Sequence, residues 1–187
     1  MRFFIALEIP ETDRIQIQEV QQKLIQLIPE ANLTNPEKLH LTIAFIGDQS
    51  ESAKEKLIEI IKNSALNIQP FTVTPSYIDG FPHIHTANTL WIGINGEIDE
   101  LYKLRHHIKD GLESLNLPVD QRRFVPHIAI AKLINFEMTP EIENKLEEIM
   151  NQPFSPITIT SVKLFESVPD KGLHQHNTLA EIQLISS

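Results

Sequence analysis

Strand-like and helix-like stretches alternate along this sequence from one end to the other, and this alternation limits the fold more than any other feature. No linker, low-complexity tract or charged tail interrupts it. The order is roughly βαβαβ followed by βαβαββ, so each half of the chain offers a similar set of elements. A length of 187 residues fits one domain, or two small lobes that share a core.

Two kinds of apolar spacing locate the elements. Strand-like stretches predict strands near residues 2–9, 40–46, 71–78, 89–94, 127–133, 157–165 and 179–185. Apolar residues three and four positions apart predict helices with buried stripes over residues 17–28, 53–61, 98–115 and 142–150. Ser50 is expected to cap the second helix and Thr139 the fourth, and residues 79–82 are expected to form a turn.

Composition excludes several classes of protein. No apolar run approaches the roughly 20 residues of a membrane span, and the first residues lack the h-region of a signal peptide. Cysteine is absent, which excludes thiolate metal sites and fits a cytoplasmic protein. The formal net charge of −9 argues against a protein that coats nucleic acid. It is compatible with a monomeric enzyme, without an obligate protein partner, that holds one terminal phosphate through local cations.

Each half of the chain contains one apolar strand that carries a histidine. Because side chains alternate across a strand, His40 shares a face with Thr42, and His127 shares a face with Ala129. The opposite face of each strand is a continuous apolar stripe. Small residues beside each histidine leave room for a ligand. A distant internal duplication and a chance match of two apolar strands both account for the similarity.

Two imidazoles on facing strands suit the opening of a cyclic phosphodiester. One ring removes a proton from the attacking water, and the other donates a proton to the departing sugar oxygen. No metal is required, because a strained five-membered cyclic phosphate already has an activated leaving group. The hydroxyl of Thr42 is placed to bind a phosphate oxygen. The alternative for each histidine alone is a structural residue whose hydrogen bonds are satisfied.

The residues around both histidines resemble the two-histidine (2H) phosphoesterase superfamily, specifically the RNA 2′,3′-cyclic phosphodiesterases that are also known as 2′-5′ RNA ligases. The likeness covers nearly the whole chain and includes both HxTx-type motifs. It is carried by residues 2–10, 38–47, 80–82, 90–93, 123–132 and 164–167. An isolated HxT motif is weak evidence for this family, whereas two such motifs in this order, with these flanking residues, are specific evidence for it.

This resemblance implies an α+β fold over residues 1–187, a single domain of two lobes with pseudo-twofold duplication. Two antiparallel β-sheets would face a central cleft, with the helices outside. The implied substrate is an RNA end or small nucleotide with a cyclic phosphate, and no cofactor is implied. His40 would be the proton donor and His127 the proton acceptor, giving a 2′-phosphate end. The reverse step, which joins ends, would explain the ligase name.

The same comparison nominates substrate-binding residues near the two histidines: Thr42, Ala129, Arg123, Phe124 and Lys132. Ala129 replaces the usual Thr of the second motif, which removes a hydroxyl donor and predicts a weaker enzyme. Lys132 stands where the family often has Arg, and strict alternation would point it away from His127. Its role therefore needs a bulge, a twist or the end of the strand. Phe124 would stack on a base or pack in a loop or core, and Arg123 would hold a phosphate or be an ordinary loop charge.

Two alternatives to the enzyme remain. One is a nucleotide-binding member of the same fold that has lost catalysis, as Ala129 suggests. The other is a metalloprotein, although no thiolate or carboxylate triad is placed with the remaining histidines. The remaining histidines are expected to lie in loops or at the surface: His83, His85, His106, His107, His174 and His176. Ile43, Phe45 and Trp91 are expected in the core.

Overall fold

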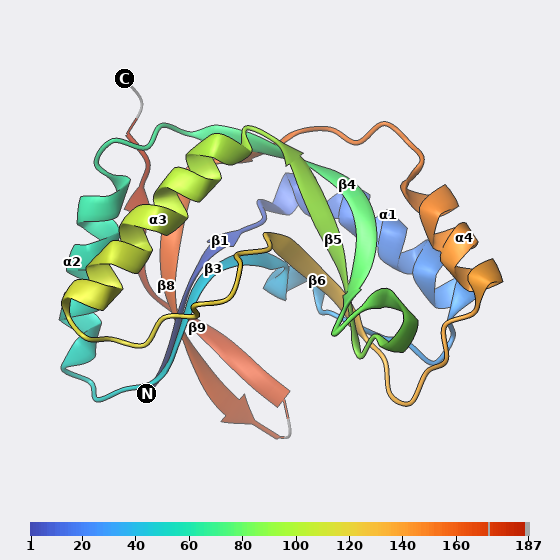
Figure 1. Cartoon of the computed structure of the whole chain (residues 1–187), viewed down its shortest axis with the longest axis horizontal. Helices are drawn as coiled ribbons and strands as arrows, with labels where there is room; N and C mark the ends of the chain where they lie inside the picture. The colour runs from blue at the N-terminus through green and yellow to red at the C-terminus, as the bar shows by residue number, and fades with distance from the viewer. Residues whose placement is uncertain (172, 186–187) are drawn as a thin grey trace.

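The computed structural model describes residues 1–171 and 173–185 and contains one strongly curved antiparallel sheet (Figure 1). The strands are β1 (Arg2–Glu8), β2 (Asn32–Leu33), β3 (His40–Asp48), β4 (Phe71–Phe81), β5 (Thr89–Gly96), β6 (His127–Lys132), β7 (Ile157–Ile159), β8 (Ser161–Asp170) and β9 (Leu173–Gln183). The helices are α1 (Glu11–Leu27), α2 (Ala53–Ala65), α3 (Ile98–Ser114) and α4 (Pro140–Met150), with short 3-10 turns η1 (Pro36–Lys38) and η2 (Ile84–Thr86).

The sheet has two halves that meet between β3 and β6. Its strand order is β7-β4-β5-β6-β3-β1-β8-β9, and β2 pairs with β6 beside this path. Leu41 of β3 pairs with Ile128 of β6, and both side chains are fully buried. The predicted α+β class is therefore confirmed, and the two expected facing sheets are the two halves of one sheet.

Helices cover only the outer face of this sheet (Figure 1). Helices α2 and α3 pack on each other, with α2 against β8 and β9 and α3 against β3 and β4. Helices α1 and α4 also pack on each other, with α1 against β6 and α4 against β4. The main core lies between these helices and the sheet. A separate small apolar cluster, made by Phe4, Ala6 and Phe165, lies apart from it. None of the helices in the described ranges is long and apolar enough to span a membrane.

The fourth helix begins as the sequence predicts. The side chain of Thr139 accepts a hydrogen bond of 3.2 Å from the backbone N–H of Ile142, and Pro140 stands at the first helical position. The prediction for the second helix is wrong by two residues. Its cap residue is Ser52, which makes no side-chain capping bond, while the hydroxyl of Ser50 bonds to that of Ser52.

Several strands are longer than the sequence predicts, among them β4 and β9. The expected turn at residues 79–82 is wrong, because β4 continues through Phe81 and Gly80 pairs with Leu90. A β-carbon on Gly80 would lie 2.5 Å from that of Ala87, so this glycine marks a close approach of β4 to the segment between β4 and β5 rather than a turn. The last strand begins at residue 173 rather than 179, because its polar first half pairs with β8.

Candidate active site

The two histidines predicted from the sequence lie at the centre of the sheet, where its halves meet. The register between β3 and β6 places His40 next to Ala129 and Thr42 next to His127. All four side chains are half-buried and lie on the face opposite the main core, which we call the inner face. The two predicted motifs are therefore brought together on one surface.

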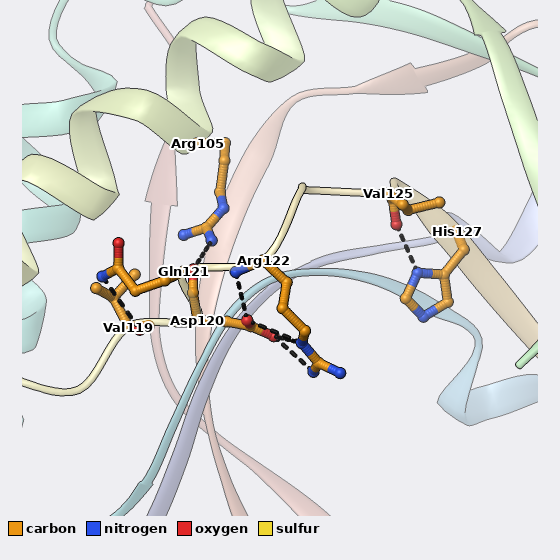
Figure 2. A network of polar contacts seen from close by, with 7 residues as sticks. All are labelled: Arg105, Val119, Asp120, Gln121, Arg122, Val125 and His127. Atoms are coloured by element: carbon orange, nitrogen blue, oxygen red, sulfur yellow. Dashed lines mark hydrogen bonds and ion pairs between the residues drawn. The ribbon is translucent and has the colours of Figure 1, made fainter. Parts of the chain in front are cut away.

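Both imidazoles are held in the same way by the backbone. Nδ1 of His40 lies 2.7 Å from the carbonyl oxygen of Lys38, and Nδ1 of His127 lies 2.7 Å from that of Val125 (Figure 2). Because a carbonyl oxygen only accepts, Nδ1 carries the hydrogen in both rings. Nε2 of each neutral ring is then the atom left for proton transfer. Nε2 of His40 lies 3.0 Å from the hydroxyl of Thr42, which donates to it in this state.

Each motif strand also has a bulge three residues after its histidine. At Ile43 and at Ile130 the motif strand advances two residues while its neighbour advances one. A bulge of this kind shifts the alternation of side chains by one position. The residues five positions after the histidines, Phe45 and Lys132, therefore share the inner face with them.

These bulges change two expectations. Phe45 does not lie in the core: it pairs with Phe4, stacks on its ring at 5.7 Å and is 56% exposed. Lys132 pairs with Thr89, which lies on the same face as Trp91, and its side chain is exposed. The bulge thus supplies the departure from strict alternation that a role for Lys132 requires.

Burial lowers the pKa of both imidazoles. For His40, the hydrogen bond to Lys38 opposes this effect, the nearby His127 adds to it, and the charge of Glu8 opposes it. For His127, the hydrogen bond to Val125 opposes the effect of burial. A proton on His127 discourages a proton on His40, so two charged rings are disfavoured relative to a state with a single charged ring. That is the state in which one ring is an acid and the other a base.

Glu8 is an anionic neighbour of His40 that the sequence did not reveal. It pairs with His40 across β1 and β3. Its carboxylate forms ion pairs with Lys163 and, at 3.2 Å, with Arg14, and Arg14 also donates from Nε to the carbonyl of Ile9. The two cations fix the carboxylate in place beside the ring.

Aromatic rings surround His127. The ring centroids of Phe81 and Trp91 lie 4.8 Å and 5.5 Å from its own, and Tyr77 meets Trp91 at 5.9 Å. A β-carbon on Gly93 would lie 2.1 Å from the ring of Tyr77, so only glycine lets this ring lie there. Trp91 is buried, and its indole N–H has no acceptor in the part of the chain that the structure describes.

A second group of rings surrounds His40. Phe4 lies 5.4 Å from His40 and stacks on Phe165 at 5.1 Å, and His176 lies 5.6 Å from His40. The expectation that His176 occupies a loop or the surface is wrong, since it is half-buried in β9. Nothing local in the sequence marks these rings as neighbours, because they come from β1, β8 and β9.

A polar network fixes the loop that leads into His127 (Figure 2). Nη2 of Arg105, on α3, donates to the carbonyl oxygen of Asp120 at 3.2 Å. The side chain of Arg122 donates to the Asp120 carboxylate, with a closest contact of 2.8 Å, and these hydrogen bonds lower the pKa of Asp120 to about 2. The loop is tied at Asp120 and again where the carbonyl of Val125 holds the histidine.

The other two residues expected to bind substrate, Phe124 and Arg123, lie in this loop rather than on a motif strand. The ring of Phe124 contacts Tyr102 at 5.7 Å, and the guanidinium carbon of Arg105 lies 5.3 Å from its centre. Both partners belong to α3, so Phe124 packs against a helix. Arg123 is exposed. Thr42, Ala129 and Lys132 are the expected binding residues that share a face with the histidines.

The remaining histidines form separate small contacts. His85 lies 3.7 Å from Glu143, and His106 lies 3.2 Å from Asp110 on the same helix. Within residues 1–171 and 173–185, no three histidine or acidic side chains lie close enough together to hold a metal ion. A hollow between α2 and α3, lined by residues such as Ile60, contains neither His40 nor His127.

Solved structures with a similar fold cover almost the whole chain. The protein TT0787 of Thermus thermophilus matches with a TM-score of 0.77 and 21% identity, covering 98% of each chain. E. coli LigT complexed with 3′-AMP matches with a TM-score of 0.76 and 18% identity, covering 99% of this chain and 98% of LigT. At these identities the likeness establishes the fold.

Sequence comparisons identify the family. The RNA 2′,3′-cyclic phosphodiesterase of Methanocaldococcus jannaschii is 30% identical over 168 residues, which cover 89% of this chain and 91% of that protein. The protein of the same name from Thermotoga maritima is 26% identical over 170 residues, which cover 89% of this chain and 87% of that protein. The family model of the 2′-5′ RNA ligase superfamily matches residues 9–171. This chain therefore belongs to the 2′-5′ RNA ligase superfamily.

Proposed function

We propose that this protein hydrolyses the 2′,3′-cyclic phosphate of an RNA end or small nucleotide, without a metal ion, and leaves a 2′-phosphate. The observation that carries the proposal is the matched orientation of His40 and His127. In each ring Nδ1 donates to the carbonyl two residues earlier, which leaves Nε2 for proton transfer. The relatives named RNA 2′,3′-cyclic phosphodiesterases support the choice of substrate.

In this proposal His127 is the general base and His40 the general acid. Nε2 of His127 takes a proton from water as the water oxygen attacks phosphorus. The bond from phosphorus to the 3′ oxygen breaks, and Nε2–H of His40 gives its proton to that oxygen. Glu8 supports the assignment, because its charge favours a proton on His40. With a 5′ hydroxyl in place of water, the same two transfers would join RNA ends through a 2′-5′ bond.

Thr42 and Lys132 are the proposed partners of the phosphate. The Thr42 hydroxyl bonds to Nε2 of neutral His40. When His40 carries its proton, Nε2 no longer accepts, so the hydroxyl hydrogen becomes free for a phosphate oxygen. Ala129 provides no equivalent donor, and losing one such bond costs about 1–3 kcal/mol of transition-state stabilisation. The phosphate is therefore held mainly from β3 and by Lys132.

The direction of attack fixes where the nucleoside lies. In an in-line displacement the attacking and leaving oxygens lie on opposite sides of phosphorus. Because water lies at His127 and the 3′ oxygen at His40, the ribose and base extend over the His40 side. There Phe45 is more than half exposed and rests on the buried ring of Phe4, so it offers a face on which a base stacks.

The test of this function is the identity of the product. Incubation with 2′,3′-cyclic AMP is expected to give 2′-AMP, at the same rate with and without EDTA, as followed by chromatography against 2′-AMP and 3′-AMP standards. Formation of 3′-AMP would contradict the position of the leaving oxygen. Binding of the cyclic nucleotide without product would identify the catalytically weakened alternative. Activity that disappears in EDTA and returns with added metal would contradict the metal-independent mechanism.

The pH dependence of kcat/KM is expected to be a bell centred below the ordinary histidine pKa of about 6.5. The active state has one charged ring, and burial lowers the pKa of both His40 and His127. Activity is therefore lost on the alkaline side when the last proton leaves, and on the acid side when the second proton binds. The pH profile of kcat should be centred at a higher pH than that of kcat/KM, because a bound phosphate anion favours the charged form of an imidazole. Profiles of kcat and kcat/KM that rise together to a plateau through pH 8 would contradict this.

A further inference from the structure

A third imidazole lies beside the proposed proton donor. The ring of His176 lies 5.6 Å from that of His40 and 4.9 Å from that of Phe4, and it is steeply inclined to both, at 77° and 71°. In the strand order, β8 and β1 separate β9 from β3. The ring of His176 therefore reaches back over the inner face, which the curvature of the sheet allows.

The β8–β9 hairpin that carries His176 is anchored next to the site. Nζ of Lys38 donates a hydrogen bond to the carbonyl oxygen of His174. The carbonyl oxygen of the same Lys38 holds Nδ1 of His40 at 2.7 Å. One residue therefore links the hairpin to the proton donor. This link fixes His176 before a substrate arrives, and preorganised contacts bind with a smaller loss of entropy.

The imidazole of His176 has hydrogen-bonding capacity that the free protein leaves unused. The side chain is half-buried, and neither ring nitrogen bonds to a residue in the described ranges. Burial lowers the pKa of His176 to about 4, and the nearby His40, Lys38 and His174 add to this effect. The ring is therefore neutral near pH 7, with one donor and one acceptor. One neutral donor beside one neutral acceptor suits the edge of a nucleobase, and it contributes little to the binding of a phosphate anion.

We propose that His176 is a specificity-determining residue that hydrogen-bonds the edge of the terminal nucleobase. The proposal rests on the proposed function, because in-line hydrolysis with the leaving oxygen at His40 places the nucleoside on this side of phosphorus. Of the rings around His40, Phe4 and Phe165 are buried, which leaves Phe45 and His176 for a ligand. Stacking on Phe45 accepts any base, whereas hydrogen bonds from His176 depend on the pattern of donors and acceptors of the base.

Binding of reaction products tests this role without any need for turnover. Isothermal titration calorimetry would compare 2′-AMP, 2′-GMP, 2′-CMP and 2′-UMP with inorganic phosphate. His176→Ala is expected to weaken the tightest nucleotide by roughly 3- to 10-fold, the effect of one neutral hydrogen bond. This substitution should also reduce the differences in affinity among the four nucleotides and leave the affinity for inorganic phosphate unchanged. His176→Asn, which keeps one donor and one acceptor, should restore part of the discrimination.

His174→Ala is the matched control, because His174 lies on the same hairpin with an exposed side chain and its carbonyl oxygen remains. This variant should bind all the ligands as the wild type does. Equal weakening of nucleotides and phosphate by His176→Ala would overturn the proposal, as would unchanged nucleotide affinity or a wild type that binds none of the nucleotides. A separate failure of hydrolysis would appear as base-dependent binding without conversion of 2′,3′-cyclic AMP.

Discussion

Replacing either His40 or His127 with Ala is expected to lower kcat for a 2′,3′-cyclic nucleotide by at least about 100-fold. Each ring performs one proton transfer, and such a transfer is typically worth about 10²–10⁴-fold in rate. Because both transfers serve one displacement at phosphorus, the double variant should be about as slow as the slower single variant. Steady-state kinetics in the presence of EDTA would measure these effects without any contribution from bound metal.

His106→Ala provides the matched control for these variants. His106 is exposed on α3 and pairs with Asp110 in the same helix, so its loss should leave kcat unchanged. Urea unfolding curves would show that the His40 and His127 variants retain the fold. Full activity in either of these two variants, with the fold intact, would remove that residue from the proposed pair.

Leu41→Ala is expected to destabilise the protein by about 2–5 kcal/mol, as Leu→Ala changes do in well-packed cores. Leu41 is fully buried and pairs with Ile128 where the two halves of the sheet meet. Its side chain lies on the outer face, between two residues whose side chains lie on the inner face, His40 and Thr42. A cavity beneath this join should also change the spacing of the two imidazoles. We therefore expect kcat to fall even in the fraction of protein that stays folded.

Urea unfolding measured beside Ile15→Ala would test this effect. Ile15 is 59% exposed on α1, so its truncation should change the free energy of unfolding by less than about 0.5 kcal/mol. If Leu41→Ala were as stable as the wild type, the join between the halves would not depend on this packing. If it were less stable but equally fast, the join would not set the distance between the histidines.

The alternation of the sequence predicts both motif strands and places each histidine on the face opposite the apolar stripe of its strand, and the structure confirms the strands. Alternation fails at the third residue after each histidine, so the prediction that Phe45 lies in the core is wrong. Ile43 and Ile130 are ordinary strand residues, and no glycine or proline at these positions marks a bulge. The bulges are defined by the register with β1 and β5, and a local pattern contains no information on that register.

The rings around His40 could not be predicted for a related reason. Phe4, Phe165 and His176 meet because β1, β8 and β9 are neighbours in the sheet. Hydrophobic spacing indicates where a strand lies, but not which distant strand pairs with it. The first half of β9 is polar on both faces, since its far end projects past the helices (Figure 1), so it lacks the alternation that would have identified it.

The two halves of the site repeat each other in detail. In both, the histidine is held by the carbonyl two residues earlier, a bulge follows at the third position, and the residue at the fifth position returns to the inner face. A chance match of two apolar strands would not produce these shared deviations from regular geometry. The repetition therefore favours an internal duplication, after which the sequences of the two halves diverged.

This repetition bears on how the two histidines divide their roles. A site with exact twofold symmetry would accept a cyclic phosphate in two orientations related by the twofold axis. The same ester oxygen would leave in both, but the histidine that is the acid in one orientation would be the base in the other. The hydrogen bonds that hold the two imidazoles cannot select between these orientations, because they are alike. Selection falls to the positions where the halves differ: Thr42 against Ala129, Phe45 against Lys132, and Glu8 beside His40. The substitutions that remove groups from the second motif would thus help to give each histidine a single role.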